Sequence, residues 1–247
     1  MNPDQLVAEF ESQGVALIES LMTPTQIVAA QAAVEWAMSE HQERYKWIRQ
    51  RTYEWFETHP VFVELMEHPL VLEIAEKILG SDFHLIAAQC SRNTKDDPYA
   101  PGAMKIHHDR VFFPSEEKIE AGISPHYYGF SAMWYVQDTP LEMGPTELIT
   151  RSHLTEEVYT EDALDGAELF RRNIPAGSLL LFFHRTWHRG AWNQTDTPRD
   201  LITNAYARRA IDKVQLTSPL ENEDDRYVPC EALIANASES IMKMLRA

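Results

Sequence analysis

The first third of the chain carries apolar residues at helical spacing. Within residues 21–44 (LMTPTQIVAAQAAVEWAMSEHQER), the apolar face consists of Ile27, Ala30, Val34 and Met38. A repeat close to 3.6 residues is typical of an amphipathic helix. Thr23 is a candidate N-cap and Pro24 suits the first helical position, so the pattern predicts a helix that begins at Pro24.

A second helix is predicted over residues 68–81 (HPLVLEIAEKILGS). Its apolar face consists of Val71, Ile74, Ala75 and Ile78. Gly80 suits the C-terminal cap, because glycine adopts a left-handed conformation without steric cost. Residues 14–19 (GVALIE) have the length of a short strand, and residues 229–247 return to a helical pattern.

Beyond Gly80 the pattern changes to short apolar runs separated by Gly, Pro, Asp and Asn. These strand-length runs are residues 83–89, 110–113, 128–136, 146–150, 178–183 and 201–207. Successive strands without strong helices between them favour a sandwich or barrel over a parallel sheet. We therefore predict a single, mainly β domain with helices packed outside it.

The composition narrows the classes of function. The chain has 247 residues, with 22 basic and 38 acidic side chains and a formal net charge of −16. This acidity argues against binding to nucleic acid or to an anionic membrane surface, which basic patches attract. Two cysteines, Cys90 and Cys230, are too few for a disulfide framework, and neither a signal peptide nor a transmembrane run is recognisable. We expect a soluble, cytoplasmic protein.

Candidate metal ligands lie in residues 105–113 (KIHHDRVFF). Side chains alternate along a strand, so His107 and Asp109 are expected to point to the same face and can share a metal ion. One more imidazole would complete a set of two histidines and one carboxylate. On an octahedral iron(II) ion, this set leaves three positions for a co-substrate and dioxygen.

Residues 177–200 (GSLLLFFHRTWHRGAWNQTDTPRD) offer two candidates for the third ligand, His184 and His188. A strand that ends at His188, followed by a short turn, would bring Arg199 alongside it. A guanidinium there can hold the far carboxylate of a metal-bound 2-oxo acid with two hydrogen bonds, which favours His188 over His184.

Each of these features has an ordinary explanation when it is taken alone. The chain has ten histidines, so a His-x-Asp pair that meets a later histidine is unsurprising, and an arginine after a turn is usually solvated. The ordered combination is far more specific. It runs from His-x-Asp through a Gly-Pro turn to an apolar strand with histidine, and then to an arginine.

Taken together, these motifs resemble the phytanoyl-CoA dioxygenase family of Fe(II)- and 2-oxoglutarate-dependent oxygenases. Residues 106–113 resemble the family's His-x-Asp segment, and residues 142–153 (EMGPTELITRSH) resemble its Gly-Pro turn and strand. Residues 177–193 resemble its distal histidine segment, with Asn193 at the family's asparagine. The resemblance spans about residues 5–215 of the sequence.

The resemblance implies a double-stranded β-helix, a cupin-like jelly roll, within one oxygenase domain over residues 1–247. Its helical part would cover about residues 1–80 and its core about residues 82–210. It also implies that Fe(II), 2-oxoglutarate and O2 oxidise a small organic substrate with release of succinate and CO2.

The resemblance also implies roles for individual residues. His107, Asp109 and His188 would be the catalytic metal ligands, and Arg199 would bind 2-oxoglutarate. Halogenating relatives have a small residue in place of the carboxylate, so the retained Asp109 favours hydroxylation, desaturation or ring chemistry.

The chain departs from the family pattern at two places. The family's Pro-Gly-Ser-His turn reads TRSH over residues 150–153. The residue two after the distal histidine, often a serine, is Gly190, and Thr203 on the following strand is a candidate substitute for the lost hydroxyl. Gln89, which precedes His107 by 18 residues, is a second candidate beside the co-substrate.

Several other side chains near the motifs are expected to be structural. Trp134 is expected in the core, His153 bonded within its turn, and Lys105 on the surface. His108 and Arg110 flank the ligands and are solvated by default, although either can meet an acidic substrate.

The motifs do not name the substrate, which is expected to contact residues 91–104 and 113–129. The second segment contains His126, Tyr127 and Tyr128 and has the length of a lid. Whether the substrate is carrier-tethered, and the oligomeric state, stay open. Two other classes fit the same ligands: a metal-binding jelly roll without turnover, and a Zn(II) hydrolase.

Overall fold

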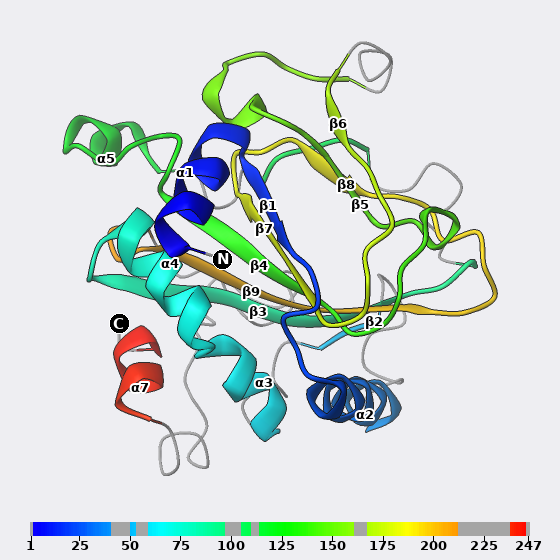
Figure 1. The fold of residues 1–247 in the computed structure, drawn as a ribbon. Coiled ribbons are helices and arrows are strands. Elements are labelled where there is room, and N and C mark those ends of the chain that lie inside the picture. The colour runs from blue at the N-terminus through cyan, green and yellow to red at the C-terminus, as the bar shows by residue number, and fades with distance from the viewer. Residues whose placement is uncertain are drawn as a thin grey trace.

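The computed structural model describes residues 2–40, 50–52, 59–96, 105–109, 114–160, 167–211 and 238–245. The helices of this part (Figure 1) are α1 Pro3–Gln13, α2 Pro24–Glu40, α3 Pro60–Met66, α4 Pro69–Leu79, α5 Glu116–Glu120 and α7 Glu239–Leu245. The strands are β1 Val15–Ile18, β2 Gln50–Thr52, β3 Phe83–Asn93, β4 Gly129–Tyr135, β5 Thr146–Ile149, β6 Leu169–Phe170, β7 Ser178–Phe183, β8 His188–Gly190 and β9 Arg199–Arg208.

The strands form two antiparallel sheets. The large sheet has the order β1-β7-β4-β9-β3-β2, and the small sheet has the order β6-β5-β8. Neighbouring strands are distant in sequence, as the pairing of β3 with β9 illustrates. Two facing antiparallel sheets with such crossovers form a jelly roll, which confirms the predicted fold class.

The large sheet separates two apolar layers. Its outer face packs against α1, α2, α3 and α4, which lie together on one side of it in Figure 1. Along β7, Leu179, Leu181 and Phe183 belong to this outer layer, while Leu180 and Phe182 point into the space between the sheets. This alternation is the two-residue period of a strand buried on both faces.

The predicted helix boundaries agree with the structure where it describes them. The Thr23 hydroxyl accepts from the Gln26 N–H, and the Gln26 side chain accepts from the Thr23 N–H, which is a reciprocal capping box. Gly80 ends α4 as predicted, with φ of 87° and ψ of 171°, a positive-φ conformation that is not the left-handed helical one and that favours glycine. Residues 41–44 of the first predicted helix lie outside the described part.

Three details of the predicted strands and one of the predicted C-terminal helix need correction or stay open. The segment 105–109 forms no regular strand and meets its neighbour only through an isolated bridge at His107. The strand that precedes His188 ends at Phe183. The predicted strand over residues 110–113 lies outside the described residues, as does the tail before residue 238.

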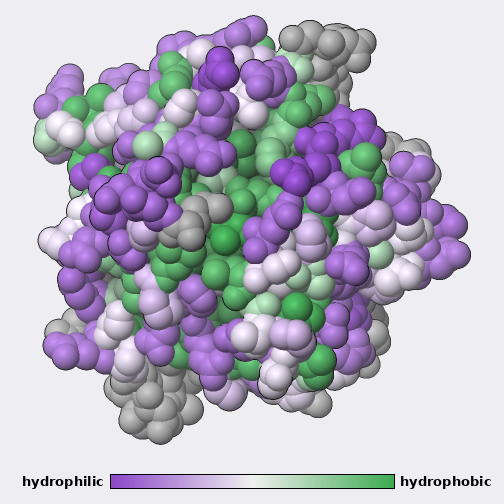
Figure 2. Space-filling model, viewed as in Figure 1, coloured by the Kyte–Doolittle hydropathy of each residue, from purple (hydrophilic) through white to green (hydrophobic). Residues whose placement is uncertain are grey.

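The surface in Figure 2, seen as in Figure 1, shows apolar residues gathered at the centre of this face and hydrophilic residues around its rim. None of the helices in the described part combines the length and the apolar character needed to span a bilayer.

Candidate metal centre

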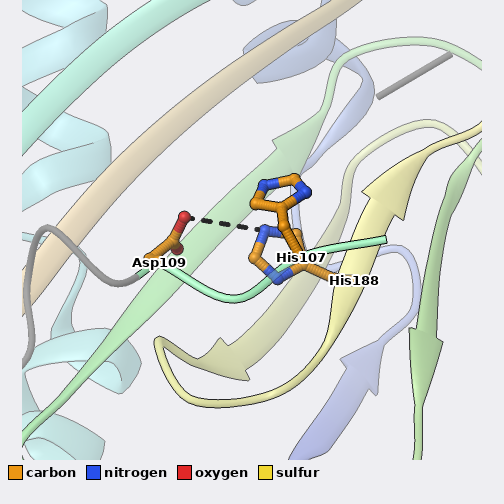
Figure 3. A group of neighbouring side chains, drawn as sticks. All are labelled: His107, Asp109 and His188. Carbon is orange, nitrogen blue, oxygen red and sulfur yellow. Dashed lines mark ion pairs between the residues drawn. The ribbon is translucent and has the colours of Figure 1, made fainter. Parts of the chain in front are cut away.

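His107, Asp109 and His188 form one compact group (Figure 3), in which the three candidate ligand atoms lie within 4.8 Å of one another. Two backbone hydrogen bonds join the two histidines: His107 N to His188 O at 3.0 Å and His188 N to His107 O at 2.7 Å. The Asp109 N–H donates to the carbonyl of His184 at 2.9 Å. Main-chain pairing therefore holds residues 107–109 against residues 184–188, and this places the three side chains close together.

Both histidine rings are oriented by the backbone. The Nδ1 atom of His107 lies 2.8 Å from the carbonyl oxygen of Lys105, and that of His188 lies 2.8 Å from the carbonyl oxygen of Thr186. A carbonyl oxygen only accepts hydrogen bonds, so Nδ1 carries the proton in each ring. This tautomer directs the lone pair of Nε2 toward the centre of the group, where the His188 Nε2 lies 3.8 Å from the Asp109 Oδ1.

The group has one buried side and one open side. His188 is buried, and the Phe182 ring lies against its imidazole with ring centroids 4.6 Å apart. His107 and Asp109 are only half-buried. A small molecule can therefore approach the group from the side of residues 107–109, while the floor is closed by the core of the jelly roll.

The chain reaches His188 by a route that differs from the predicted one. Strand β7 belongs to the large sheet and ends at Phe183, and residues 184–187 then turn toward the small sheet. His188 is the first residue of β8, not the last residue of the apolar strand. The sequence shows one apolar run, and only the sheet pairing reveals that the chain changes sheets before the histidine.

His184 lies in this turn and is not part of the metal group. Its ring is fully buried, and its centroid lies 5.9 Å from that of Tyr128. A Cβ added at Gly129 would lie 2.7 Å from the His184 Nδ1, so a glycine is required opposite the ring. Burial lowers the pKa of His184 to about 3, so this imidazole is neutral. The surroundings of His184 are those of a packing residue.

Arg199 begins β9, and its side chain returns toward the chain that follows His188. The side chain is 1% exposed, and its Nη1 lies 3.4 Å from the carbonyl oxygen of Ala191. Its positive charge also acts on Tyr135, where burial raises the pKa of the phenol and the guanidinium partly offsets this effect. The structure thus brings the buried guanidinium close to the segment that carries His188.

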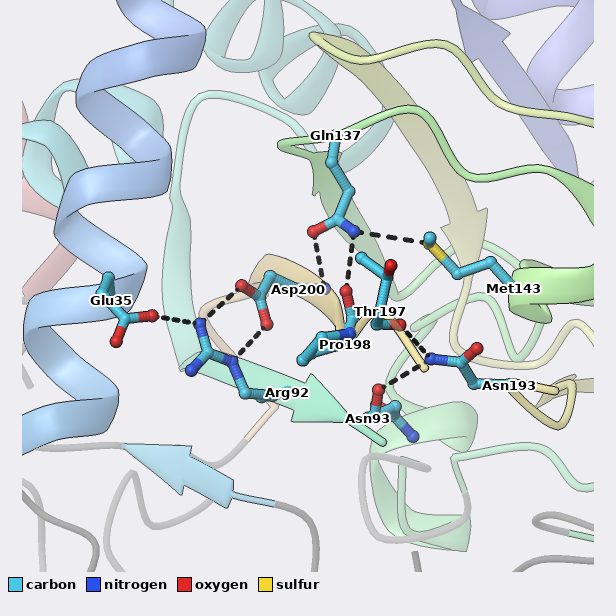
Figure 4. Close-up of polar contacts among 9 residues, drawn as sticks. All are labelled: Glu35, Arg92, Asn93, Gln137, Met143, Asn193, Thr197, Pro198 and Asp200. Carbon is cyan, nitrogen blue, oxygen red and sulfur yellow. Dashed lines mark hydrogen bonds and ion pairs between the residues drawn. The ribbon is translucent and has the colours of Figure 1, made fainter. Parts of the chain in front are cut away.

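The turn between β8 and β9 is held by amide side chains (Figure 4). The Asn193 side chain donates to the carbonyl oxygens of Asn93 at 3.1 Å and Thr197 at 2.8 Å. The Gln137 side chain donates to Pro198 O at 2.7 Å and accepts from the Asp200 N–H at 3.3 Å. The backbone on both sides of residue 199 is therefore fixed.

A salt-bridge network supports the other face of the same strand. Arg92 on β3 donates through Nε and Nη2 to the two carboxylate oxygens of Asp200, each at 2.8 Å. Its Nη2 also lies 2.7 Å from the carboxylate of Glu35 on α2 (Figure 4). Two parallel hydrogen bonds give this pair a defined geometry, so the start of β9 is rigid.

The two weaker co-substrate candidates are cross-strand partners. Gln89 on β3 lies opposite Thr203 on β9, and Met133 on β4 lies on the other side of Thr203. Thr203 lies four residues after Arg199, so both side chains are on the inner face of β9. The Thr203 hydroxyl is buried and has no hydrogen-bond partner among the described residues.

The remaining candidates have structural surroundings where they are described. Trp134 is fully buried on the helix side of the large sheet. Lys105 is exposed. The His108 ring stacks on Trp187 with centroids 4.4 Å apart, and so lies away from the metal group. Arg110 lies outside the described residues.

His153 is bonded to α1 and not within its turn, so that prediction was wrong. The ring is buried beneath α1, where its Nε2 donates to the Glu11 carbonyl at 2.9 Å, and it stacks on Phe183. Burial lowers the pKa of His153 to about 4, although the hydrogen bond to the Glu11 carbonyl raises it in part. The unfolded chain, with a pKa near 6.5, therefore binds more protons than the folded chain between about pH 4 and 6.5.

We predict that the free energy of unfolding falls as the pH drops through this window. The His153 contribution amounts to about 3 kcal/mol at most, from 1.36 kcal/mol per pKa unit. His153→Gln keeps a donor for Glu11 but does not titrate. It should be less stable than wild type at pH 7 and lose less stability between pH 6.5 and 4, as measured by urea unfolding. Parallel curves for the two proteins would contradict the prediction.

Sequence reasoning missed three residues near the site. Tyr135 and Thr146 exchange two hydrogen bonds, Tyr135 Oη to Thr146 Oγ1 at 3.0 Å and Thr146 N to Tyr135 Oη at 3.1 Å, and they join the two sheets beside Arg199. Arg185 lies in the turn before His188 and is almost completely buried. Arg185 could have been noticed in the sequence, because it is a charged residue between an apolar strand and a candidate ligand.

The geometry defines a class of protein: a jelly roll with a His-x-Asp pair, a distal histidine and a buried arginine at the start of the next strand. A family model described as phytanoyl-CoA dioxygenase (PhyH) matches residues 10–201. The chain belongs to this family of oxygenases, which confirms the resemblance.

Solved structures with the same fold are also similar along most of their length. The epimerase SnoN from nogalamycin biosynthesis, solved with Fe3+, alpha ketoglutarate and nogalamycin RO, has a TM-score of 0.70 and 17% identity over 92% of this chain and 93% of its own. The carbocyclase SnoK has a TM-score of 0.65 and 19% identity, covering 82% and 83%. HygX from Streptomyces hygroscopicus, with nickel, 2-oxoglutarate and hygromycin B, has a TM-score of 0.64 and 15% identity, covering 83% and 87%.

Proposed function

We propose that this chain is an Fe(II)- and 2-oxoglutarate-dependent dioxygenase that hydroxylates a small organic molecule. The observation that carries the proposal is the group of His107, Asp109 and His188, with ligand atoms within 4.8 Å of one another. Two imidazoles and one carboxylate suit iron(II) with open coordination positions. The hydrogen bonds from both Nδ1 atoms to backbone carbonyls support this assignment, because metal-binding histidines are oriented in this way.

Arg199 would bind the distal carboxylate of 2-oxoglutarate, because a buried guanidinium forms strong paired hydrogen bonds with a carboxylate. The Thr203 hydroxyl supports a polar ligand in the same space, since buried hydroxyls rarely lack a partner and this one has none among the described residues. Gln89, opposite Thr203, offers an amide to the same ligand.

When bound, iron(II) supplies the redox chemistry by which 2-oxoglutarate, dioxygen and a substrate C–H bond become succinate, CO2 and an alcohol. The chain's own residues orient the reactants and limit access of water. Phe182 and the buried His188 close the floor. The retained Asp109 carboxylate supports hydroxylation over halogenation. The small molecules bound in the solved relatives support a small-molecule substrate here.

The first test is spectroscopic. Adding iron(II) and then 2-oxoglutarate without oxygen should give a visible metal-to-ligand charge-transfer band. Admitting air should then release succinate slowly even without substrate. A well-folded protein that gives neither signal is not an enzyme of this class, and metal analysis after native purification would separate a zinc hydrolase from a non-catalytic metal protein. Product analysis separates hydroxylation from epimerisation and carbocycle formation, the reactions of SnoN and SnoK.

A further inference from the structure

Arg185 is a buried cation whose carboxylate partner is exposed. Its side chain is 9% exposed, whereas that of Glu156, with which it forms an ion pair, is 85% exposed. The Arg185 Nη2 also donates to the carbonyl of Thr155 at 3.2 Å. The cation is thus fixed in the protein, while the anion reaches it from a surface segment.

The main chain at Arg185 lies next to the metal group. Arg185 immediately follows His184, whose carbonyl accepts the Asp109 N–H at 2.9 Å. The charges of Asp109 and Arg185 both act on the buried Tyr128, whose pKa is raised mainly by burial. Tyr128 is therefore close to both Asp109 and Arg185.

Two histidines also act electrostatically on the same carboxylate. The pKa of Glu156 is lowered first by its hydrogen bond with Arg185, and His126 and His108 lower it further. His108 stacks on Trp187, two residues after Arg185, and His126 is held through its Nδ1, 2.8 Å from the His153 carbonyl oxygen. Arg185 is thus the permanent cation at the place that Glu156 occupies.

An exposed carboxylate is easily exchanged from such a position. Glu156 gains little from the ion pair, because its exposed carboxylate is well hydrated when it is apart and loses side-chain freedom when it pairs. A buried guanidinium, in contrast, needs an anion to offset its desolvation. The Arg185 site therefore stays occupied, but its occupant can change.

We propose that Arg185 binds an anionic group of the substrate, a carboxylate or a phosphate, and that Glu156 holds this place until the substrate arrives. The inference rests on the proposed function and narrows its substrate class to anions. In a chain with a net charge of −16, such a substrate needs a local cation for recognition beside the metal group.

The test uses the iron-loaded protein and pairs of compounds of which one carries an anionic group and the other is its neutral counterpart. Carboxylic acids are compared with their primary amides, and phosphate monoesters with their parent alcohols, by the succinate released above the substrate-free level. The proposal expects acids or phosphate esters, and not their neutral partners, to stimulate succinate release. The two anion classes are distinguished by which of them gives the lower KM.

Three variants test the role of the two side chains. Arg185→Gln should raise the KM of a stimulating anion about 10- to 100-fold, and Arg185→Lys should raise it less, because one charge-assisted hydrogen bond is retained. Glu156→Gln should lower that KM a few-fold, since the competing carboxylate is removed. If the ion pair were purely structural, Arg185→Gln and Glu156→Gln would change the KM in the same direction.

The exposed ion pair of Arg172 and Glu19, at 2.6 Å, gives matched controls, and Arg172→Gln and Glu19→Gln should leave the KM unchanged. Wild-type protein that releases succinate but responds to no anion, or equally to charged and neutral partners, overturns the inference and leaves the proposed function intact. Protein that binds no iron with 2-oxoglutarate refutes both.

Discussion

Replacing His188 by alanine is expected to lower the affinity for iron(II) by more than about 100-fold and to abolish succinate release. Loss of a residue that merely orients a ligand costs about 10- to 100-fold in metal affinity, so loss of a ligand itself should cost at least as much. The remaining His107 and Asp109 provide two ligands on a segment that holds its neighbour through an isolated bridge. Bound iron after anaerobic loading and desalting measures the effect.

The neighbouring His184 provides the matched control. His184→Ala removes an imidazole four residues earlier, in the turn that precedes β8, and it should retain iron. It should also lower the free energy of unfolding by about 2–4 kcal/mol, because it opens a cavity beneath Gly129. Retention of iron by His188→Ala together with its loss from His184→Ala would show that the wrong histidine was chosen.

The order of residues along the chain predicted much of this site. The His-x-Asp pair and the distance from His188 to Arg199 are local features of the sequence. The turn between His188 and Arg199 could also be predicted, since Asn193 and Pro198 are typical turn residues and both take part in its hydrogen bonds. The starts and ends of α2 and α4 were predicted where their caps, Thr23 and Gly80, are local, whereas α1, α3 and α5 were not predicted.

What could not be predicted depends on pairing between distant strands. The sequence does not reveal that β7 and β8 belong to different sheets, so the strand that delivers His188 was misidentified. The pairing of Gln89 with Thr203 likewise exists only through the antiparallel register of β3 and β9. Arg185 was overlooked because its importance comes from burial and from the exposed Glu156 opposite it, and neither is a local property.

The same topology explains how one short stretch of chain can serve both ends of a co-substrate. β8 pairs with β5 in the small sheet, and β9 pairs with β3 and β4 in the large sheet. The turn between them therefore crosses from one sheet to the other. His188 and Arg199 enter the space between the sheets from opposite walls, which a hairpin within a single sheet would not allow.

Replacing Arg199 by alanine is therefore expected to weaken 2-oxoglutarate binding while iron stays bound. Two hydrogen bonds between a guanidinium and a carboxylate contribute about 1.5–3 kcal/mol each, so the KM for 2-oxoglutarate should rise at least about 100-fold. Titration of the charge-transfer band measures the affinity directly. Arg199→Lys keeps the charge but not the planar fork, and it should lie between wild type and Arg199→Ala.

A structural role for Arg199 would give a different result. Arg199→Ala leaves a guanidinium-sized space beside the Ala191 carbonyl, so added guanidinium should partly restore 2-oxoglutarate binding if the lost interaction is chemical. Arg172→Ala, on the surface, should change neither iron nor 2-oxoglutarate affinity. A variant that folds, binds iron and keeps its KM for 2-oxoglutarate would remove Arg199 from the co-substrate site, because its burial would then serve the β8–β9 turn alone.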